Sequence, residues 1–443
     1  MASKKVPETR YARAADGVFL AYQVVGGGPV DIVVEMNPNL SNVDLIWEEP
    51  AWRQLLLGML DLGRLVLHDR RGLGVSSRNV VPPNLETRAS DLVTVLDAAG
   101  VDHAFLAGGG EGGAMHAVFA ATFPERVSGL LWNGPTARMA WAPDYPWGSE
   151  SEELQRQLES EPWGTTQWMR DGLSEGAASR PDLDDRRVET YAKIARNSAT
   201  PDVAAKFERI WAETDVRAVL SSVHAPAILL IGDQDNVAEA EYVASLMPNA
   251  RLHVVPGSSL SAIDPLLSVL RTLVGAAALP VGLDTVLATV MFTDIVDSTA
   301  RQAAMGDRAW KALINDHHDV VRDCLQRWRG VENDTAGDGF YASFDGPARA
   351  VRCALEIVER LQPLGVQIRA GIHTGECELI DGKHGGLTVT IGSRIAAIAD
   401  PSEVVVSQTV KDLVAGSGLS FGAATEHHLK GVPGTWNLYQ VIP

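Results

Sequence analysis

The stretch LAGGGEGGAMHAVFAATFPERV, residues 106–127, decides the fold of the first half of the chain. A short apolar strand at 104–107 runs into glycines and then into an apolar helix that ends at Pro-Glu-Arg. A strand, a sharp turn and a helix in this order form the elbow that presents a nucleophilic serine in the pattern G-x-S-x-G. Here residues 108–112 read GGGEG, so Gly110 stands in the place of the serine. The sequence therefore predicts the elbow without its nucleophile.

Short apolar runs alternate with helical patterns through the first half of the chain. The predicted strands are residues 32–35, 65–67, 104–107, 130–132, 228–231 and 252–255. Buried strands separated by helices predict a doubly wound α/β sheet. The strand pattern stops over residues 141–219, and this acidic, tryptophan-containing segment is predicted to form a helical lid over the sheet. We expect its tryptophans to pack between helices rather than to stack on a ligand.

A second pattern follows a small, Gly- and Pro-punctuated stretch. The predicted parts are a first domain, a join and a second domain, residues 1–274, 275–285 and 286–443. The second domain begins with a strand at 286–292 and an amphipathic helix. Two strands that flank Gly337-Asp-Gly339, a second helix and a strand at 366–372 follow. The order βαββαβ predicts an α+β fold of the ferredoxin-like type.

Composition and charge exclude several classes of protein. The net charge of the 443 residues is −18, and neither half offers the basic face that a nucleic acid would require. The three cysteines lack metal-ligand spacing and fit a reducing compartment. The longest uncharged apolar stretch, residues 272–283, is shorter than the about 20 residues that cross a bilayer. We therefore expect a cytoplasmic protein without a membrane span and without a nucleic-acid partner.

The first half resembles the α/β-hydrolase family over roughly 270 residues. The resemblance rests on "DRRGLGVSS", the glycine elbow, "FPERV" and "ILLIGDQD". Acyl transfer on this fold requires a serine, a histidine and an acid. Asp235 stands at the place of the acid, where it is also explained as a loop acid or helix cap. Leu260, in "VVPGSSLSA", stands at the place of the histidine.

These positions predict a degenerate hydrolase domain that keeps the fold and has lost the reaction. Its lid is expected to shelter a space that takes a small apolar ligand, an expectation that rests on fold analogy. An esterase or lipase is disfavoured because neither a nucleophile nor a base is found.

Two carboxylates in the second half lie where strands end. Asp294 follows a strand in "VMFTDIVDSTA", just before a helix that Asp297 or Ser298 is placed to cap. Asp338 lies at the tip of a Gly-Asp-Gly hairpin. Each acid alone is also explained as a cap or a turn residue. Neighbouring strands bring both to one edge of the sheet, where two oxygen ligands beside a helix N-terminus suit Mg²⁺ or Mn²⁺ with a triphosphate.

A wider set of motifs makes the second half of the chain resemble a known protein family. They are "FTDIVDST", "GDGF", "IRAGIHTGE", "VTIGSRIAAIA", "PSEVVVSQTVKDL" and "LKGVPGTWNLYQV". Residues from about 286 to 441 resemble a class III nucleotidyl cyclase catalytic domain of the bacterial adenylyl cyclase type. The pairing with a hydrolase-like half is similar to an actinobacterial cyclase architecture.

This resemblance implies a mechanism and a partner. Two protomers join head to tail, and each active site lies across their interface. Two metal ions per site, on Asp294, Asp338 and the Ile295 carbonyl, hold the triphosphate of ATP. The ribose 3′-OH attacks the α-phosphorus, and pyrophosphate leaves as cyclic AMP forms. Arg394 of the opposite protomer stabilises the growing phosphate charge, although as a lone residue it is also explained as a solvent-facing helix arginine.

Arg369 and Lys430 fall near phosphate-contacting positions of the family. Two other positions depart from its pattern. Asp334 stands where the family has a base-reading lysine, and Thr390 stands where an asparagine or histidine orients the ribose. The family has a second base-reading position. Aligned without a gap, it falls on Lys383 of this chain; with a gap, it is absent because the loop here is shorter. We prefer the second interpretation.

The departures predict slow cyclisation of ATP with weak base selectivity, so that GTP stays open as a substrate. The alternative function is a catalytically degenerate protein that binds a nucleotide and regulates without turnover.

Overall fold

The computed structural model describes residues 6–150, 163–174, 184–259, 263–276, 285–380 and 383–442. The chain divides into two compact units, Met1–Leu283 and Asp284–Pro443. Each unit has a β-sheet of its own. The predicted join at 275–285 lies largely outside the described residues, so its extent stays a prediction. No helix in the described ranges is both long and apolar enough to cross a membrane.

The first unit is built on an eight-stranded sheet in the order β1-β2-β4-β3-β5-β6-β7-β8. The strands are β1 (Arg10–Arg13), β2 (Phe19–Val25), β3 (Asp31–Glu35), β4 (Arg64–His68), β5 (Ala104–Gly109), β6 (Val127–Asn133), β7 (Ala227–Gly232) and β8 (Ala250–Val255). The six strands from β3 to β8 are parallel to one another and confirm the six predicted strands. The antiparallel pair of β1 and β2 was not predicted.

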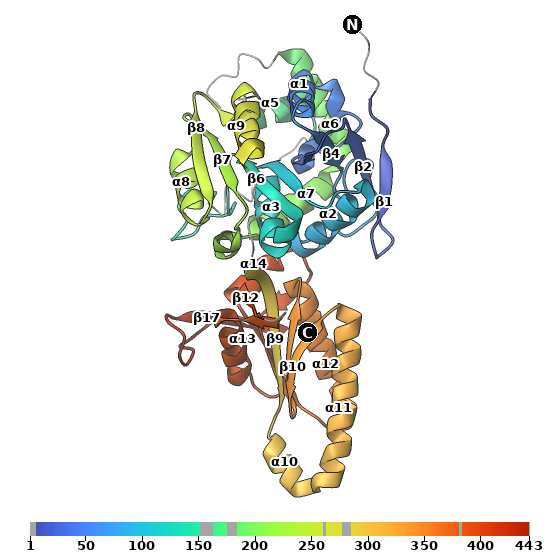
Figure 1. Cartoon of the computed structure of the whole chain (residues 1–443), viewed down its shortest axis with the longest axis vertical. Helices are drawn as coiled ribbons and strands as arrows, with labels where there is room; N and C mark the ends of the chain where they lie inside the picture. The colour runs from blue at the N-terminus through green and yellow to red at the C-terminus, as the bar shows by residue number, and fades with distance from the viewer. Residues whose placement is uncertain are drawn as a thin grey trace. The chain divides into compact units, whose positions relative to one another are not determined.

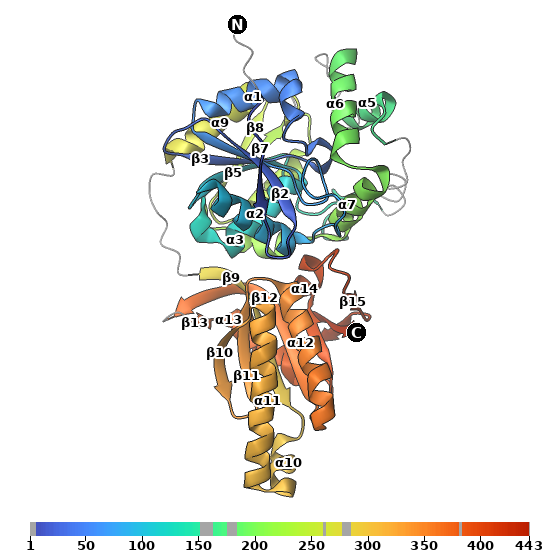
Figure 2. The same ribbon diagram turned by 90° about the vertical axis from the view of Figure 1, so that its right-hand side faces the viewer.

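Helices cover both faces of this sheet, which confirms the doubly wound fold (Figure 2). On one face lie α1 (Pro50–Leu60) and α9 (Ile263–Ala276), whose apolar side chains pack with those of the central strands. On the other face lie α2 (Leu85–Ala99) and α3 (Glu111–Thr122). The short helix α8 (Val237–Ser245) connects β7 to β8. Because helices bury both faces of the sheet, the middle residues of β3, β4 and β5 are apolar.

The segment between β6 and β7 is helical in its described parts and contains no named strand there. Its helices are α5 (Thr166–Ser174), α6 (Asp185–Ser198) and α7 (Pro201–Glu213). The rings of Trp163 and Trp168 lie 4.4 Å apart. Trp211 is buried in α7. These tryptophans therefore pack within the helical segment. Residues 151–162 and 175–183 of the predicted lid lie outside the described residues.

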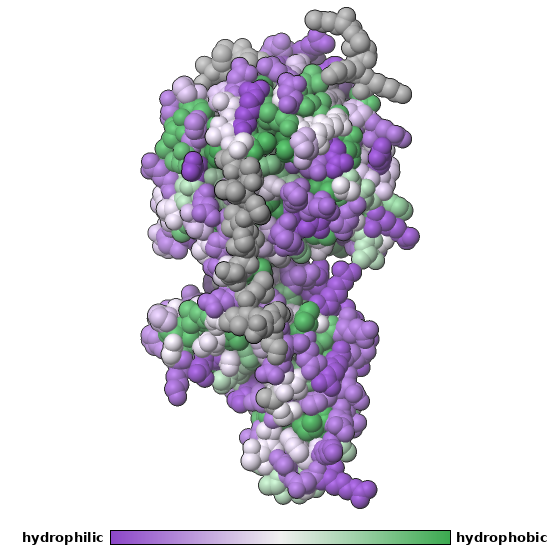
Figure 3. Space-filling model, viewed as in Figure 1, coloured by the Kyte–Doolittle hydropathy of each residue, from purple (hydrophilic) through white to green (hydrophobic). Residues whose placement is uncertain are grey.

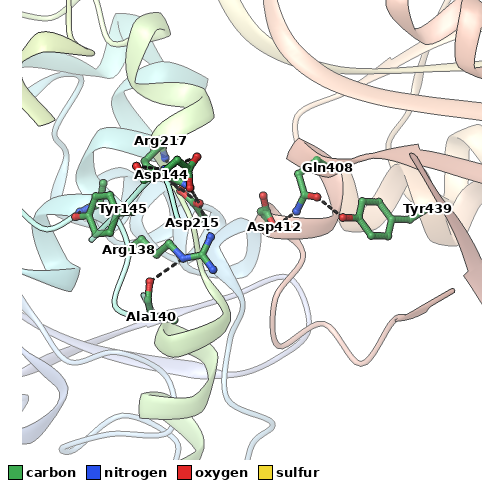
Figure 4. A network of polar contacts seen from close by, with 10 residues as sticks. Arg138, Ala140, Asp144, Tyr145, Asp215, Arg217, Gln408, Asp412 and Tyr439 are labelled. Carbon is green, nitrogen blue, oxygen red and sulfur yellow. Dashed lines mark hydrogen bonds and ion pairs between the residues drawn. The ribbon is translucent and has the colours of Figure 1, made fainter. Parts of the chain in front are cut away.

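Ion pairs join the two ends of this segment to each other. Arg217 pairs with Asp215 and Asp144 at 2.7 and 3.0 Å (Figure 4). Arg138 pairs with the same Asp215 at 3.0 Å and donates a hydrogen bond to the Ala140 carbonyl. These residues follow β6 and precede β7 in the chain. The ion pairs therefore hold the two ends of the helical segment together.

The second unit is built around a mainly antiparallel sheet. Its main strands follow the order β10-β11-β9-β12-β14-β17-β15. They are β9 (Thr285–Ile295), β10 (Val331–Ala336), β11 (Gly339–Phe344), β12 (Ile368–Ile380), β14 (Val404–Ser407), β15 (Ser420–Phe421) and β17 (Trp436–Ile442), with β13 (Lys383–Gly385) on β12 and β16 (Thr425–His427) on β17. The helices are α10 (Ser298–Met305), α11 (Asp307–Trp328), α12 (Pro347–Leu361), α13 (Leu387–Ile398) and α14 (Gln408–Leu413).

The elements β9, α11, β10, β11, α12 and β12 give the predicted βαββαβ order. Helices α11 and α12 cover one face of the sheet and α13 lies on the other (Figure 1). Figure 3 shows mostly hydrophilic side chains over the outer side of the long helix α11. Helix α14 is tied to β17 through Gln408, which accepts a hydrogen bond from the Tyr439 hydroxyl and donates one to Asp412 (Figure 4).

Helix α13 lies directly on the backbone of the sheet because of two glycines. A Cβ atom at Gly371 of β12 would stand 2.0 Å from the backbone nitrogen of Ala396. A Cβ atom at Gly392 would stand 2.6 Å from Cγ2 of Val290 in β9. The position of α13, and of any side chain on its outer face, therefore depends on the absence of these two methyl groups.

We predict that Gly371→Ala separates α13 from the sheet and lowers the free energy of unfolding of the second unit. Overpacking a well-packed core costs about 1–3 kcal/mol, and here the clash is with backbone that cannot rotate away. Thermal unfolding followed by circular dichroism measures the loss. The control is Gly422→Ala, where the nearest atoms lie at 3.8 Å. Equal melting temperatures for both variants would contradict the close approach.

Candidate functional site

The elbow of the first unit keeps its backbone geometry. Gly110 links β5 to α3 with φ 47° and ψ −119°. A Cβ atom there would meet nothing within 4 Å, so the tip faces open space. Trp132 of β6 donates a hydrogen bond from Nε1 to the Gly110 carbonyl at 2.9 Å. The elbow is therefore a turn that favours glycine and offers no side chain for attack.

A closed set of buried charges lies beside this elbow. Arg70 and Arg88 each bridge Glu35 and Glu111, with N–O distances of 2.5–2.8 Å. All four side chains are at most 9% exposed. His116 places Nε2 3.2 Å from the second oxygen of Glu35. We call the four residues Arg70, Arg88, Glu35 and Glu111 the elbow ion network.

The arginines determine the charge state of this network. Burial alone would raise the pKa of Glu35, but Arg70 and Arg88 hold it well below the ordinary 4.5. The same arginines outweigh burial at Glu111 and lower its pKa. On α7, burial and the neighbouring Glu111 raise the pKa of Glu208 to about 7. Buried, paired charges thus lie beside the elbow, which the sequence did not predict, and the small apolar ligand stays a prediction.

The other two hydrolase positions do not form a catalytic pair in the described residues. Asp235 accepts hydrogen bonds at Oδ2 from the backbone nitrogens of Gly232 and Ser259, at 3.2 and 2.8 Å. This carboxylate joins the end of β7 to the loop after β8, which is the structural role that a loop acid has. Leu260, the residue at the place of the histidine, lies outside the described residues.

We predict that Glu111→Gln destabilises the first unit strongly. Removing one charge of a buried pair leaves the other uncompensated and costs about 3–5 kcal/mol. Asp97→Asn is the matched control, because Asp97 pairs with Arg126 but its side chain is 63% exposed. That change is expected to cost less than about 1 kcal/mol. Urea denaturation compares the two variants, and equal costs would contradict the burial of the network.

The pH dependence of this loss follows from the lowered pKa of Glu111. A carboxyl whose folded pKa lies below its unfolded value stabilises the protein fully above pH about 4.5, and the stabilisation is lost as pH falls through the folded pKa. The stability gap between wild type and Glu111→Gln should therefore narrow as pH falls below about 4.5. Melting temperatures between pH 3 and 7 measure the gap. A gap that widens in acid would contradict this account.

In the second unit, two carboxylates meet at one edge of the sheet. Asp294 lies near the end of β9, and Asp338 lies at the tip between β10 and β11. The backbone nitrogen of Ile295 donates a hydrogen bond to Oδ2 of Asp338 at 3.3 Å. Burial raises the pKa of Asp338, a hydrogen bond with Ser298 opposes the rise, and the negative charge of Asp294 adds to it. The two acids are therefore electrostatic neighbours, as the sequence predicted.

Arg369 places a positive charge beside this pair. It lies directly opposite Asp294 in the register of β12 and β9. Its Nη2 stands 2.8 Å from Oδ2 of Asp294, and both side chains are more than a third exposed. Asp297 begins α10 with a left-handed backbone (φ 55°) and makes no capping hydrogen bond with its side chain. Asp294, Asp338, Ser298 and Arg369 thus form one cluster.

The donor set of this cluster fits a small divalent cation. Carboxylate and carbonyl oxygens are the ligands that Mg²⁺ prefers, and it usually keeps waters and substrate phosphates for its other positions. Among the described residues, no group of three or more His, Cys, Asp or Glu side chains is arranged to hold a metal by itself. The protein therefore offers two carboxylates, and the rest of a coordination sphere would come from water and phosphate.

The face of the sheet that carries Asp294 also carries Asp334, for which the sequence predicts contact with the base. Val290, Phe292 and Asp294 alternate along β9, and the first two contact α13. The rings of Phe292 and Tyr341 stack at 4.7 Å. Asp334 lies opposite Tyr341 in the register of β10 and β11. Its carboxylate is exposed and accepts a hydrogen bond from the backbone of Thr335.

Thr390 and Arg394 form a separate group on α13. They are four residues apart and share one side of the helix, while Ile391 and Ile395 are buried against the sheet. Nε of Arg394 donates a hydrogen bond to the Lys430 carbonyl at 3.1 Å. Because this side of α13 faces away from the sheet that carries Asp294, the structure does not bring Arg394 to the carboxylate pair of its own chain.

Residues 284–443 match the family described as the adenylate and guanylate cyclase catalytic domain. Residues 63–260 match the family described as the alpha/beta hydrolase fold. The first unit also resembles the bromoperoxidase from Bacillus anthracis, with a TM-score of 0.51 and 18% identity, over 60% of this chain and 100% of that one. That likeness shows the fold alone. The two predicted fold classes are thereby confirmed.

The curated relatives each match part of the chain. A 3-oxoadipate enol-lactonase of Acinetobacter baylyi is 23% identical over 56% of this chain and 90% of its own length. An uncharacterized protein of Mycobacterium tuberculosis is 31% identical over 29% of this chain and 45% of its own length. An adenylate cyclase of Lachancea kluyveri is 29% identical over 32% of this chain and 9% of its own length. The chain thus spans less than half of the last two. The cyclase match supports a nucleotidyl cyclase, a lyase of a class that generally uses divalent metals.

Proposed function

We propose that this chain is an adenylate cyclase that converts ATP to cyclic AMP and pyrophosphate in its second unit. The first unit is a catalytically inactive regulatory or ligand-sensing domain. The observation that carries the proposal is the meeting of Asp294 and Asp338 at one sheet edge, in a unit that matches the cyclase family. A cytoplasmic location, where ATP is made available, belongs to the same proposal.

The cluster assigns a part of the chemistry to each side chain. Asp294, Asp338 and the Ile295 carbonyl would hold Mg²⁺ or Mn²⁺, with two ions expected per site. The ions, when bound, supply charge that favours loss of the ribose 3′-OH proton and offsets the charge of the triphosphate. Arg369, which pairs with Asp294 at 2.8 Å, would offer its guanidinium to the phosphates of the nucleotide. Ser298 holds Asp338 through a hydrogen bond.

A second copy of the chain completes the site. Arg394 and Thr390 lie on the side of α13 that faces away from their own carboxylates, so they serve the cluster of a partner in a head-to-tail dimer. Arg394 stabilises the charge that grows on the α-phosphate, because a guanidinium donates two parallel hydrogen bonds to phosphate oxygens. Lys430 lies beside it, since its carbonyl accepts from Arg394, and contacts the phosphates.

Two departures make the reaction slow and loosely selective. The hydroxyl of Thr390 is shorter than an amide or imidazole, and misplacing a reacting group typically costs about 10²-fold in rate. Asp334 only accepts hydrogen bonds, whereas a lysine only donates them. Guanine presents two adjacent donors, N1–H and N2–H₂, to such a carboxylate, and adenine presents its amino group. We therefore expect some turnover of GTP beside that of ATP.

The second candidate function is regulation through nucleotide binding without turnover. The altered positions Asp334 and Thr390 favour it, because neither metal binding nor phosphate binding requires them. An esterase is disfavoured, because Gly110 has no nucleophilic side chain and Asp235 accepts hydrogen bonds from two backbone nitrogens.

The test is product formation by the full chain with Mn²⁺ and either ATP or GTP, measured by chromatography of cyclic nucleotides. We expect cyclic AMP from the wild type and a loss of about 10²-fold or more in Asp294→Ala, which removes a metal ligand. The matched control is Asp316→Ala, an exposed acid on α11 of the same unit. Undiminished product from Asp294→Ala would refute the proposed site. No product from wild type, with Mn²⁺-dependent nucleotide binding intact, would favour the regulatory function.

A further inference from the structure

The hairpin that carries Asp338 is held from behind by helix α11. Nε2 of His318 lies 2.9 Å from the carbonyl oxygen of Gly337, the residue just before Asp338. A carbonyl only accepts, so the ring must carry its proton on Nε2 to make this bond. Gly337 has φ 66°, so its carbonyl direction is set by a left-handed turn that favours glycine. His318 was not singled out by the sequence patterns.

The ring of His318 is itself fixed in place. It packs edge to face on Phe340 with the ring centroids 5.0 Å apart and the planes at 87°. Phe340 is 1% exposed and lies one residue after Gly339, on the other side of the hairpin tip. The neighbouring His317 is buried and also packs on Phe340, at 5.6 Å. One imidazole thus contacts both arms of the hairpin, through a hydrogen bond to one and a ring contact to the other.

A second contact holds the same hairpin one helical turn further along α11. Arg322 donates from Nε and Nη2 to the two carboxylate oxygens of Glu332 at 2.8 and 2.9 Å. Thr335, closer to the tip, donates to Glu332 at 2.6 Å. This hydrogen bonding lowers the pKa of Glu332 to about 2. Arg322 anchors the base of the hairpin through Glu332, and His318 forms a hydrogen bond with its tip.

We propose that His318 is a positioning residue that sets where Asp338 meets its metal ion. The proposal rests on the proposed function, since it takes Asp338 as a metal ligand. The Asp338 carboxylate accepts from Ile295 and Ser298 on one side. His318 fixes the preceding peptide on the other side. A tip held on both sides keeps a carboxylate within the small tolerance that Mg²⁺ and Mn²⁺ require.

Two substitutions separate the hydrogen bond from the packing of the ring. His318→Phe keeps an aromatic ring against Phe340 and removes the donor to Gly337. His318→Gln places an amide nitrogen near the position of Nε2 and restores a donor. His427→Phe is the matched control, because His427 also bonds through Nε2 to a neighbouring group, the Thr425 hydroxyl, in β16 and away from the carboxylate pair.

The experiment measures Mn²⁺ binding to the full-length chain by electron paramagnetic resonance of the free ion, with Mn²⁺ alone as the probe. The Mn²⁺ concentration for half-maximal cyclase activity is a second readout. We expect His318→Phe to weaken Mn²⁺ binding about tenfold, as loss of a supporting contact around a metal ligand does. His318→Gln should bind within about twofold of wild type and His427→Phe like wild type. Melting temperatures should be similar in all four proteins.

Unchanged Mn²⁺ binding in His318→Phe would overturn the inference while leaving the proposed function in place. Equal weakening in His318→Gln and His318→Phe would also overturn it, because the donor would then not matter. The proposed metal site is tested separately with Asp338→Ala. If that variant binds Mn²⁺ as tightly as wild type, the metal site falls, and the inference falls with it.

Discussion

The second unit depends on holding two like charges together at one edge of a sheet. Asp294 and Asp338 come from neighbouring segments, and their mutual repulsion raises the pKa of Asp338 beyond the effect of its burial. Surrounding groups compensate for this repulsion in part, through Arg369 and the hydrogen bonds from Ile295 and Ser298. A divalent cation would compensate for it more completely. The contacts of β9, α10 and β12 with this pair meet part of that requirement.

In the first unit, by contrast, the charges beside the elbow are buried and paired. In the elbow ion network, two arginines and two glutamates are buried and paired with one another, so little charge is left to act on a substrate. Gly110 offers no nucleophile, and Asp235 accepts hydrogen bonds from the end of β7 and from the loop after β8. The carboxylates of the second unit are more exposed and incompletely neutralised. We therefore expect chemistry at the incompletely neutralised carboxylates of the second unit. The fully paired charges of the first unit are expected to stabilise its fold.

Much of the fold could be read from the sequence because it depends on local patterns. The apolar strands, the glycine elbow and the Gly-Asp-Gly tip each lie within a few residues, and the structure confirms them. The elbow ion network could not be read in this way, since its members are spread from Glu35 to Glu111 and meet only in the folded unit. The contact of His318 with Gly337 was not predicted from the sequence for the same reason. The roles of Asp334, Thr390 and Lys430 stay predictions, because they depend on a nucleotide and a partner chain.

The central claim is that each active site takes its carboxylates from one chain and Arg394 from another. Mixing Asp294→Ala with Arg394→Ala tests it most directly, because each variant alone should be almost inactive. Random pairing of the two variants makes half of the dimers mixed, each with one intact site, so the mixture should recover about a quarter of wild-type cyclic nucleotide production. No recovery, in a mixture shown to exchange subunits, would contradict a site shared between two chains.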